Sequence, residues 1–293
     1  MSSSTSGVAA RLFSVSNGLD PAIAEKRARL ESILSCMGRT LVAFSGGVDS
    51  ALLLSEAVRI LDRDVVGVIA RSASLPEAEY ADAVGFASER GIPLRTLDTR
   101  EIDREGYRAN AGDRCYHCKA ELFEQLEALC GAEGFQSLAY GAVTDDLGDV
   151  RPGMKAAEAF HVRAPLLEAE ISKLEVRVLA RHVGLRVWDK PQSACLASRI
   201  PVGTEVTEGK LKQVELAEAW IRGAFGVRVV RVRHDGTRAR IEVSPSDVGL
   251  LSRADSMAAL GTALRGIGFA QVVVDPRGYQ RKDPYPIDVK GDR

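Results

Sequence analysis

Two adjacent glycines in the stretch LVAFSGGVDSALLL join a buried strand pattern to a helix pattern. Gly46 and Gly47 allow a tight turn and a close approach of a ligand to the backbone. The first N–H groups of the helix that follows would attract an anion. The loop lacks the lysine of a Walker phosphate loop and offers the hydroxyls of Ser45 and Ser50 and the carboxylate of Asp49. Because a carboxylate beside phosphates needs a counter-ion, the pattern predicts a phosphate site in which Asp49 binds Mg²⁺.

The cysteines form a second group of residues with chemical potential. Cys115 and Cys118 stand in the string RCYHCK, and thiolates at this spacing can share a metal or cluster or form a redox pair. Cys195 lies in the irregular string KPQSACLASRIP, in a setting where reactive side chains are often presented. Cys36 and Cys130 occupy apolar helix positions and are interpreted as core residues. Three thiolates on a [4Fe–4S] cluster would leave one iron open to a further ligand such as sulfide.

Strand and helix patterns alternate through the first two thirds of the chain, which predicts a parallel sheet covered on both faces. Strands are expected at 40–44, 64–72, 93–99 and 137–144, and helices at 21–38, 49–61, 77–91 and 116–134. After the irregular stretch 187–207 the pattern changes to adjacent strands at 227–234 and 239–244, a helix at 246–265 and a strand at 269–275. We therefore predict an α/β domain over 21–203 and a smaller α+β domain over 204–293 for substrate or oligomer contacts.

Composition and charge limit the classes of function. The chain has 293 residues, a net charge of -1 and a pI of about 6.5, so it lacks an electrostatic footprint for nucleic acid. No apolar run reaches the ~20 residues of a membrane helix. Residues 1–20 are serine-rich and are interpreted as a flexible tail rather than a transit peptide. An odd count of five cysteines argues against disulfides, and a cytoplasmic location is expected.

The string SGGVDS resembles the pyrophosphate loop of the N-type ATP pyrophosphatases, which include GMP synthetase, NAD synthetase, argininosuccinate synthetase and several tRNA thiolases. The resemblance implies an adenine nucleotide alpha hydrolase-like (PP-loop) fold. It also implies that residues 45–50 hold the β,γ-pyrophosphate of ATP while a substrate oxygen attacks the α-phosphate. The nucleoside is expected over the carboxyl ends of the parallel strands, where the chain has Ala70, Arg71, Ser72 and Gly141.

Three longer segments resemble the LarE family: GAVTDDLGDVRPGMKAAEAF, APLLEAEISKLEVRVLARHVGL and VWDKPQSACLASRIPVGTEVT. With the glycine loop, the resemblance covers roughly residues 21–245, and DDLGDVRPG and CLASRIP are its most specific strings. LarE proteins are ATP-dependent sulfur transferases that help to build the nickel-pincer nucleotide cofactor of lactate racemase. The resemblance implies a small-molecule substrate, a pyridinium mononucleotide with two ring carboxylates. Each carboxylate is adenylated and then converted to a thiocarboxylate.

The LarE family has two branches, which differ in the source of sulfur. In one branch a single cysteine, matching Cys195, gives up its own sulfur and becomes dehydroalanine. In the other branch three cysteines, matching Cys115, Cys118 and Cys195, hold a [4Fe–4S] cluster that carries an extra sulfide. All three positions are cysteine in this sequence. The cluster branch is therefore predicted, with ATP, Mg²⁺ and [4Fe–4S] as cofactors.

The resemblance also implies residues that bind the substrate. Arg231 and Glu242 match the substrate-phosphate position and a nearby acidic position, although solvated strand charges explain both residues equally well. Arg199 is a further candidate for the substrate, and Asp146 for the nucleotide. In the tail VVVDPRGYQRKDPYPI, Gln280 stands where an arginine is expected, so a phosphate contact from this tail is not predicted. The family further suggests a homo-oligomer, a hexamer.

Three other functions compete with a LarE-type sulfur transferase. A tRNA thiolase combines a pyrophosphate loop with cluster cysteines, but the net charge of -1 and the lack of a second C-x-x-C string disfavour RNA binding. An amide-forming synthetase leaves the three cysteines unexplained. A non-enzymatic nucleotide sensor leaves the CLASRIP segment without a task.

Overall fold

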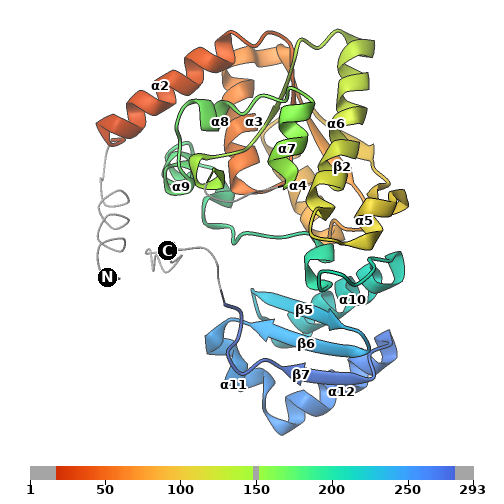
Figure 1. Cartoon of the computed structure of the whole chain (residues 1–293). Helices are drawn as coiled ribbons and strands as arrows, with labels where there is room; N and C mark the ends of the chain where they lie inside the picture. The colour runs from red at the N-terminus through yellow and green to blue at the C-terminus, as the bar shows by residue number, and fades with distance from the viewer. Residues whose placement is uncertain (1–17, 148–151, 281–293) are drawn as a thin grey trace.

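The computed structural model describes residues 18–147 and 152–280, which form a larger α/β unit and a smaller α+β unit (Figure 1). The serine-rich residues 1–17 lie outside the described residues, so the flexible tail stays an expectation. Asp149, within the DDLGDVRPG string, and residues 281–293 lie outside them as well. Within the described ranges, no helix combines the length and apolar character needed to cross a bilayer.

The larger unit is built on a parallel sheet of four strands in the order β3-β2-β1-β4. Successive side chains of a strand point to opposite faces, so Val42 and Phe44 enter one core cluster while Leu41 and Ala43 enter the other. The strands are β1 (Thr40–Ala43), β2 (Val65–Arg71), β3 (Leu94–Asp98) and β4 (Ser137–Tyr140). The α/β fold with a parallel sheet is thereby confirmed.

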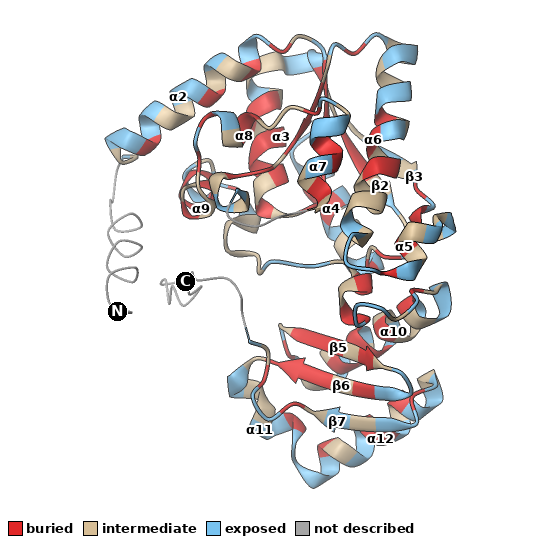
Figure 2. Ribbon diagram, viewed as in Figure 1, coloured by how far each residue is buried: buried red, intermediate tan, exposed pale blue. Residues whose placement is uncertain are grey.

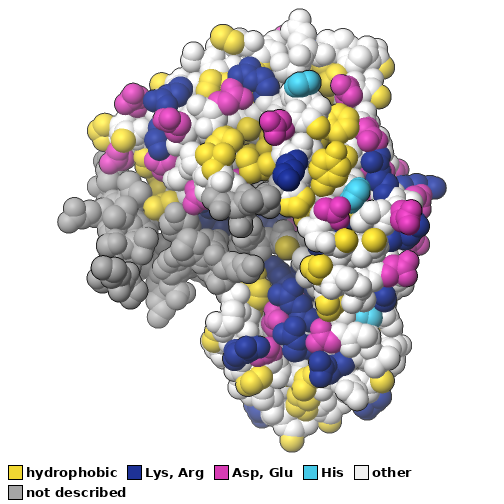
Figure 3. Space-filling view, viewed as in Figure 1, with side chains coloured by type: hydrophobic (Ala, Val, Ile, Leu, Met, Phe, Trp, Pro, Cys, Tyr) yellow, Lys and Arg dark blue, Asp and Glu magenta, His cyan; other side chains and the backbone are white. Residues whose placement is uncertain are grey.

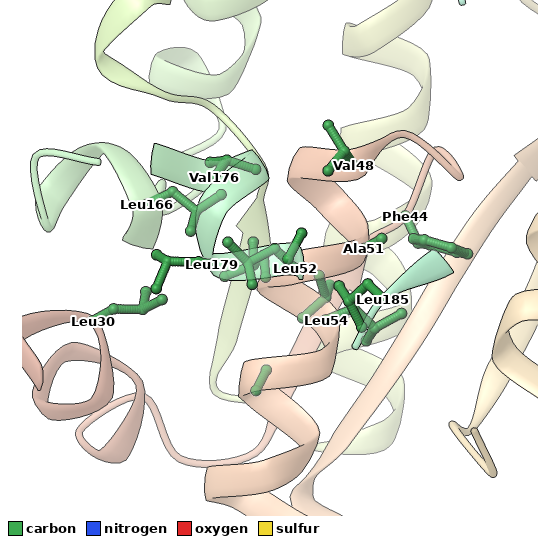
Figure 4. Close-up of a cluster of buried hydrophobic side chains, with 14 of the residues drawn as sticks. Leu30, Phe44, Val48, Ala51, Leu52, Leu54, Leu166, Val176, Leu179 and Leu185 are labelled. Atoms are coloured by element: carbon green, nitrogen blue, oxygen red, sulfur yellow. The ribbon is translucent and has the colours of Figure 1, made fainter. Parts of the chain in front are cut away.

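Helices cover both faces of this sheet, which leaves the strands among the most buried parts of the chain (Figure 2). On one face, apolar side chains of α3 pack with those of α9 and α2 and with Phe44 at the end of β1 (Figure 4). On the other face, α6 and α7 pack over β4. The helices are α2 (Pro21–Ser35), α3 (Val48–Leu61), α4 (Glu77–Glu89), α5 (Glu105–Ala109), α6 (Arg114–Glu133), α7 (Pro152–Ala159), α8 (Pro165–Glu168) and α9 (Lys173–His182).

The smaller unit is a three-stranded sheet in the order β5-β6-β7, with β5 and β6 antiparallel and β6 and β7 parallel. One face, which includes Val232 and Ile241, packs on α10 and α12, whereas the other face carries Arg231, Arg233 and Glu242. Its elements are α10 (Glu208–Phe225), β5 (Val230–Asp235), β6 (Arg238–Val243), α11 (Val248–Leu251), α12 (Ala254–Ile267) and β7 (Gln271–Val274).

The structure departs from the sequence-based expectation in the helices. The single helix expected over 246–265 is wrong: it is divided into α11 and α12, because Arg253 has an extended backbone and serves as the N-cap of α12. Two helices, α9 and α10, were not predicted. Both had readable start signals, since the hydroxyls of Ser172 and Thr207 cap their first turns.

Gly141 holds the end of β4 against the start of α3. A Cβ at this position would lie 2.8 Å from the Ser50 backbone nitrogen and 3.0 Å from the Asp49 carbonyl carbon. We expect Gly141→Ala to lower the free energy of unfolding by about 1–3 kcal/mol, because the first turn of α3 must shift. Gly131→Ala on α6 is the matched control, since a Cβ there meets nothing within 4 Å. That control should stabilise by up to about 1 kcal/mol. Urea unfolding measures both, and equal stability of the two variants would contradict the close packing at Gly141.

Candidate active site

The glycine loop ends in a helix without a side-chain cap. Gly46 adopts a positive φ of 73°, and a Cβ there would lie 2.9 Å from the Ala83 Cβ. Gly47 is the N-cap of α3 and contributes no side-chain hydrogen bond. The first N–H groups of α3 are therefore available to an anion from outside the protein.

Two serines of the loop have different tasks. The Ser50 hydroxyl is buried, accepts a hydrogen bond from the Ser45 N–H at 3.2 Å and donates to the Gly47 carbonyl at 3.1 Å. The Ser45 hydroxyl lies 3.1 Å from that of Ser50, and its residue is exposed. Ser50 thus braces the turn, and Ser45 is the hydroxyl most open to a ligand.

Asp49 forms an ion pair with Lys173 beside the loop. Burial raises the pKa of the Asp49 carboxyl, and the Lys173 ammonium acts in the opposite direction. The Asp49 Oδ1 atom is buried and, among the described residues, has no hydrogen-bond partner. The nearby carboxylate of Asp146 further raises the pKa of Asp49. Asp49 is therefore a carboxylate that one lysine satisfies only in part.

Lys173 reaches the loop because it begins α9. Ser172 and Glu175 form a reciprocal capping box, in which the Glu175 carboxylate accepts from the Ser172 N–H at 2.7 Å. The Lys173 N–H donates to the Asp145 carboxylate at 2.8 Å. The Asp146 carboxylate accepts from the backbone N–H three residues earlier. In this structure both aspartates fix the backbone near the loop, and Asp146 also lies within electrostatic range of Asp49.

The larger of two cavities at the loop has a volume of about 300 Å³. The loop forms one end, and the segment 190–195, which ends in Cys195, forms the other. Three cations line it: Lys173, Arg177 and Lys190. Arg177 donates to the carbonyl oxygens of Trp188 and Lys190, and Lys190 also pairs with Glu79 at 2.7 Å. A phosphate group and a cysteine sulfur can therefore share one cavity.

The smaller cavity, of about 180 Å³, lies over the carboxyl ends of the parallel strands and shares Ser45 and Asp49 with the larger one. Ala70 and Gly141 line it, as expected for a nucleoside site. Arg71 and Ser72 do not line it. The Arg71 guanidinium is paired with Glu77 at 3.2 Å, and the Ser72 hydroxyl lies 3.0 Å from that of Ser74.

The structure brings the three candidate cysteines close to one another. Cys115 and Cys118 lie in the first two turns of α6, and Cys195 is the N-cap of the short helix η5 (Leu196–Arg199). Burial raises the pKa of the Cys118 and Cys195 thiols, and each lies within electrostatic range of Cys115. Within the part of the chain that the structure describes, no group of three or more His, Cys, Asp or Glu side chains is arranged to hold a single metal ion. The cysteines are thus neighbours without forming such a site.

The Cys195 segment is held by guanidinium groups that donate to its backbone carbonyls. Arg199 is 1% exposed, donates to the Cys195 carbonyl at 3.0 Å and pairs with Glu218 at 2.8 Å. Arg114, which precedes Cys115, donates to the Ala197 carbonyl at 2.9 Å. In this structure Arg199 supports the segment from within and does not face a cavity.

The smaller unit supplies two further contacts to this segment. Arg231 donates to the Gln192 carbonyl and Arg233 to the Ser198 carbonyl, each at 3.0 Å. Arg231 is 7% exposed and stacks on the Tyr279 ring at 5.4 Å. Glu242 pairs with Arg233 at 2.8 Å. Lys and Arg side chains gather over β5 and β6, on the side that faces the larger unit (Figure 3).

The sequence-based prediction missed the cations of the larger cavity. The glycine loop has no lysine, but α9 brings Lys173 to it from 124 residues away. Lys173 and Arg177 are four residues apart in the string SKLEVRVLARH, so one helix face presents both. That spacing was the available signal, and it required α9 to be predicted as a helix.

The uncapped glycine turn on a parallel sheet and the cavity over the strand ends define an α/β protein of the PP-loop class. A scan against models of protein families found no match. An uncharacterised protein of Synechocystis is 40% identical over 255 residues, which are 86% of this chain and 95% of that protein. The pyridinium-3,5-bisthiocarboxylic acid mononucleotide synthase of Lactiplantibacillus plantarum is 33% identical over 260 residues, which are 88% of this chain and 93% of that protein.

These similarities extend over most of the chain, which therefore belongs to the LarE family of pyridinium-3,5-bisthiocarboxylic acid mononucleotide synthases. A more distant similarity, 26% identity over 165 residues, links half of the chain to a glutamine-hydrolysing GMP synthase of Sulfurisphaera tokodaii. GMP synthetases are among the pyrophosphatases whose loop the SGGVDS string resembles.

Removal of the Lys173 ammonium tests its part in the loop. We expect Lys173→Met to weaken ATP binding roughly tenfold or more, because a charged contact is lost and Asp49 then repels the phosphates. Lys26→Met is the matched control, since Lys26 pairs with Glu175 at similar burial outside both cavities. Isothermal titration calorimetry measures both variants. Equal ATP affinity of Lys173→Met and the wild type would contradict a contact between Lys173 and the phosphates.

Proposed function

We propose that this chain is an ATP-dependent sulfur transferase that converts the carboxylates of a pyridinium-3,5-dicarboxylic acid mononucleotide to thiocarboxylates. The relative from Lactiplantibacillus plantarum is named for the product of such a reaction. The observation that carries the proposal is the larger cavity, in which the phosphate loop and Cys195 line the same space. A site that only bound nucleotide would have no need of a cysteine there.

ATP would lie across both cavities. The nucleoside fits the smaller cavity beside Ala70 and Gly141, and the β- and γ-phosphates fit the N-terminus of α3. Lys173 and Arg177 add positive charge on the pyrophosphate side. The unpartnered Oδ1 of Asp49 suits a hard cation, so Asp49 would hold Mg²⁺, which neutralises phosphate charge when bound.

The reaction would proceed in two displacements. First, a carboxylate oxygen of the substrate attacks the α-phosphorus, the bond to the oxygen bridging the α- and β-phosphates breaks, and pyrophosphate leaves with the electron pair. Second, a sulfur nucleophile attacks the acyl carbon, the carbon–oxygen bond to AMP breaks, and AMP leaves. Adenylation is required because a free carboxylate is a poor electrophile. Two ring carboxylates require two rounds.

The smaller unit would bind the phosphate of the substrate. Arg231 is nearly buried, and among the described residues no carboxylate lies within ion-pair distance of it. Burial and the neighbouring Arg199 lower the pKa of its guanidinium, so an anion at this point would be stabilised. Glu242 would orient Arg233 beside it, and Arg199 would position Cys195.

The source of sulfur is proposed from the three cysteines. Cys115, Cys118 and Cys195 would hold a [4Fe–4S] cluster, whose ligands are bound to different irons and stand farther apart than those of a single ion. When bound, such a cluster has one iron without a protein ligand, which can carry sulfide as the co-reactant. The alternative is that Cys195 attacks the acyl carbon, its Cβ–sulfur bond then breaks, and dehydroalanine remains.

Other properties implied by the family are proposed here as well. The five cysteines are free thiols, which suits a cytoplasmic location. A homo-oligomer, a hexamer, is proposed from the family resemblance alone, and sedimentation of the full chain tests it. The domain limits 21–203 and 204–293 are proposed from the change of pattern after the CLASRIP string, and limited proteolysis tests them.

The reaction is tested with anaerobically purified protein, the dicarboxylate mononucleotide, ATP, Mg²⁺ and sulfide. We expect AMP, pyrophosphate and the thiocarboxylate, identified by mass spectrometry. Asp49→Ala should release no pyrophosphate while keeping the wild-type circular dichroism spectrum, because Asp49 faces the cavities. Normal ATP consumption by Asp49→Ala would contradict the assignment of the loop. Pyrophosphate release without any thiocarboxylate would contradict sulfur transfer.

Serine variants separate the two sources of sulfur. Cys115→Ser, Cys118→Ser and Cys195→Ser should each lose visible absorption and activity together, because a hydroxyl binds iron poorly compared with a thiolate. Cys130→Ser, farther along α6, should keep both and serves as the control. Full activity of Cys118→Ser, with loss of sulfur mass from Cys195, would contradict the cluster and leave sulfur transfer intact.

A further inference from the structure

Lys119 occupies an unusual position in the smaller cavity. It follows Cys118 on α6, is partly buried and lines the cavity together with Asp49 and Ser50. Its ammonium lies 5.6 Å from the centre of the Phe123 ring and 5.2 Å from that of the Tyr140 ring. Aromatic faces attract a cation, but they do not replace the hydrogen bonds that an ammonium loses on leaving water.

Lys119 lacks an anionic partner. Across residues 18–147 and 152–280 it forms no ion pair and no hydrogen bond, and Asp146 affects it only through space. The other lysines on the cavity walls are paired: Lys173 with Asp49, and Lys190 with Glu79. Since partly buried charges in proteins are normally paired, this ammonium is suited to an anion that enters the cavity.

The side chain is also held in place. Gly153, in the RPG part of the DDLGDVRPG string, lies on α7 against the aliphatic stem of Lys119. A Cβ at Gly153 would be 3.1 Å from Lys119 Cδ and 3.3 Å from Cε. The two rings contact the ammonium end, and the glycine allows α7 to approach the stem. The packing therefore fixes the direction of an unpaired cation.

The anion is identified by what else lines the two cavities. Lys173 and Arg177 serve the larger cavity on the pyrophosphate side, and the nucleoside has no charge to offer. The α-phosphate is the group between them, beside Ser45, Asp49 and Ser50, which both loop and smaller cavity present. We propose that Lys119 is a catalytic residue that binds the α-phosphate of the nucleotide and stabilises AMP as it leaves. This inference rests on the proposed function.

The charge on the α-phosphate explains why a lysine there aids the reaction. In the adenylated substrate this phosphate joins two groups and carries one negative charge. When sulfur attacks the acyl carbon, the carbon–oxygen bond breaks and its electron pair stays on the oxygen of AMP, which becomes a dianion. A cation beside that oxygen binds the product-like transition state more strongly than the ground state. Lys119 keeps its protons throughout.

Binding of AMP and of adenosine to the full-length protein tests this role. We expect Lys119→Met to bind AMP roughly ten- to a hundredfold more weakly than the wild type, by calorimetry, since one charged hydrogen bond is lost. Adenosine, which lacks the phosphate, should bind both proteins equally. Lys119→Gln serves as a second variant should methionine disturb the packing. Lys155→Met, an exposed lysine on α7, removes the same charge and should bind AMP as the wild type does.

Several outcomes would overturn the inference. Unchanged AMP affinity in both Lys119 variants, with a wild type that releases pyrophosphate, would overturn it and leave the proposed function intact. Equal losses for AMP and adenosine would overturn it, since the phosphate would not be the group contacted. An equal loss in Lys155→Met would do the same, because any nearby charge would then suffice. Failure of the wild type to bind AMP would overturn both proposals.

Discussion

A carboxylate at the helix N-terminus that is built to receive phosphates is the constraint on which the rest of this site depends. Asp49 is favoured by the positive end of α3 but opposes any phosphate that binds there. The chain meets that conflict with cations from elsewhere: Lys173 and Arg177 on α9, and Lys119 on α6. A Walker loop carries its lysine within the loop. Here the positive charge reaches the loop only when the whole α/β unit has folded.

The second constraint is that an irregular segment must hold Cys195 in a definite place. Residues 192–198 form no strand, so their carbonyl groups have no ladder partners. Arginines provide those partners from both units: Arg114 and Arg199 on one side, Arg231 and Arg233 on the other. The Arg199–Glu218 pair is buried, and loss of either charge would leave the other without compensation. Geometry at the cysteine is thus set by the contact between the two units.

The sequence predicted what depends on local pattern. The strands, the glycine turn and the helix after it follow from apolar periodicity and from the conformational freedom of Gly46. Lys173 was not predicted, because its contact with Asp49 depends on how α9 packs against α3 over 124 residues of sequence. Arg199 was expected to bind substrate, yet it is buried on Glu218, a partner on a helix that was not predicted. Charge pairing across units leaves no periodic trace in a single sequence.

The acceptors that hold the Cys195 segment are main-chain carbonyls, which every amino acid possesses. The side chains of residues 192–198 are therefore released from the task of fixing their own backbone. A mutation at position 195 changes the chemistry offered to the cavity without removing the contacts that support it. Such a division between scaffold and reactive group makes the segment evolvable: natural variation can exchange one mode of sulfur delivery for another while the surrounding architecture is inherited unchanged.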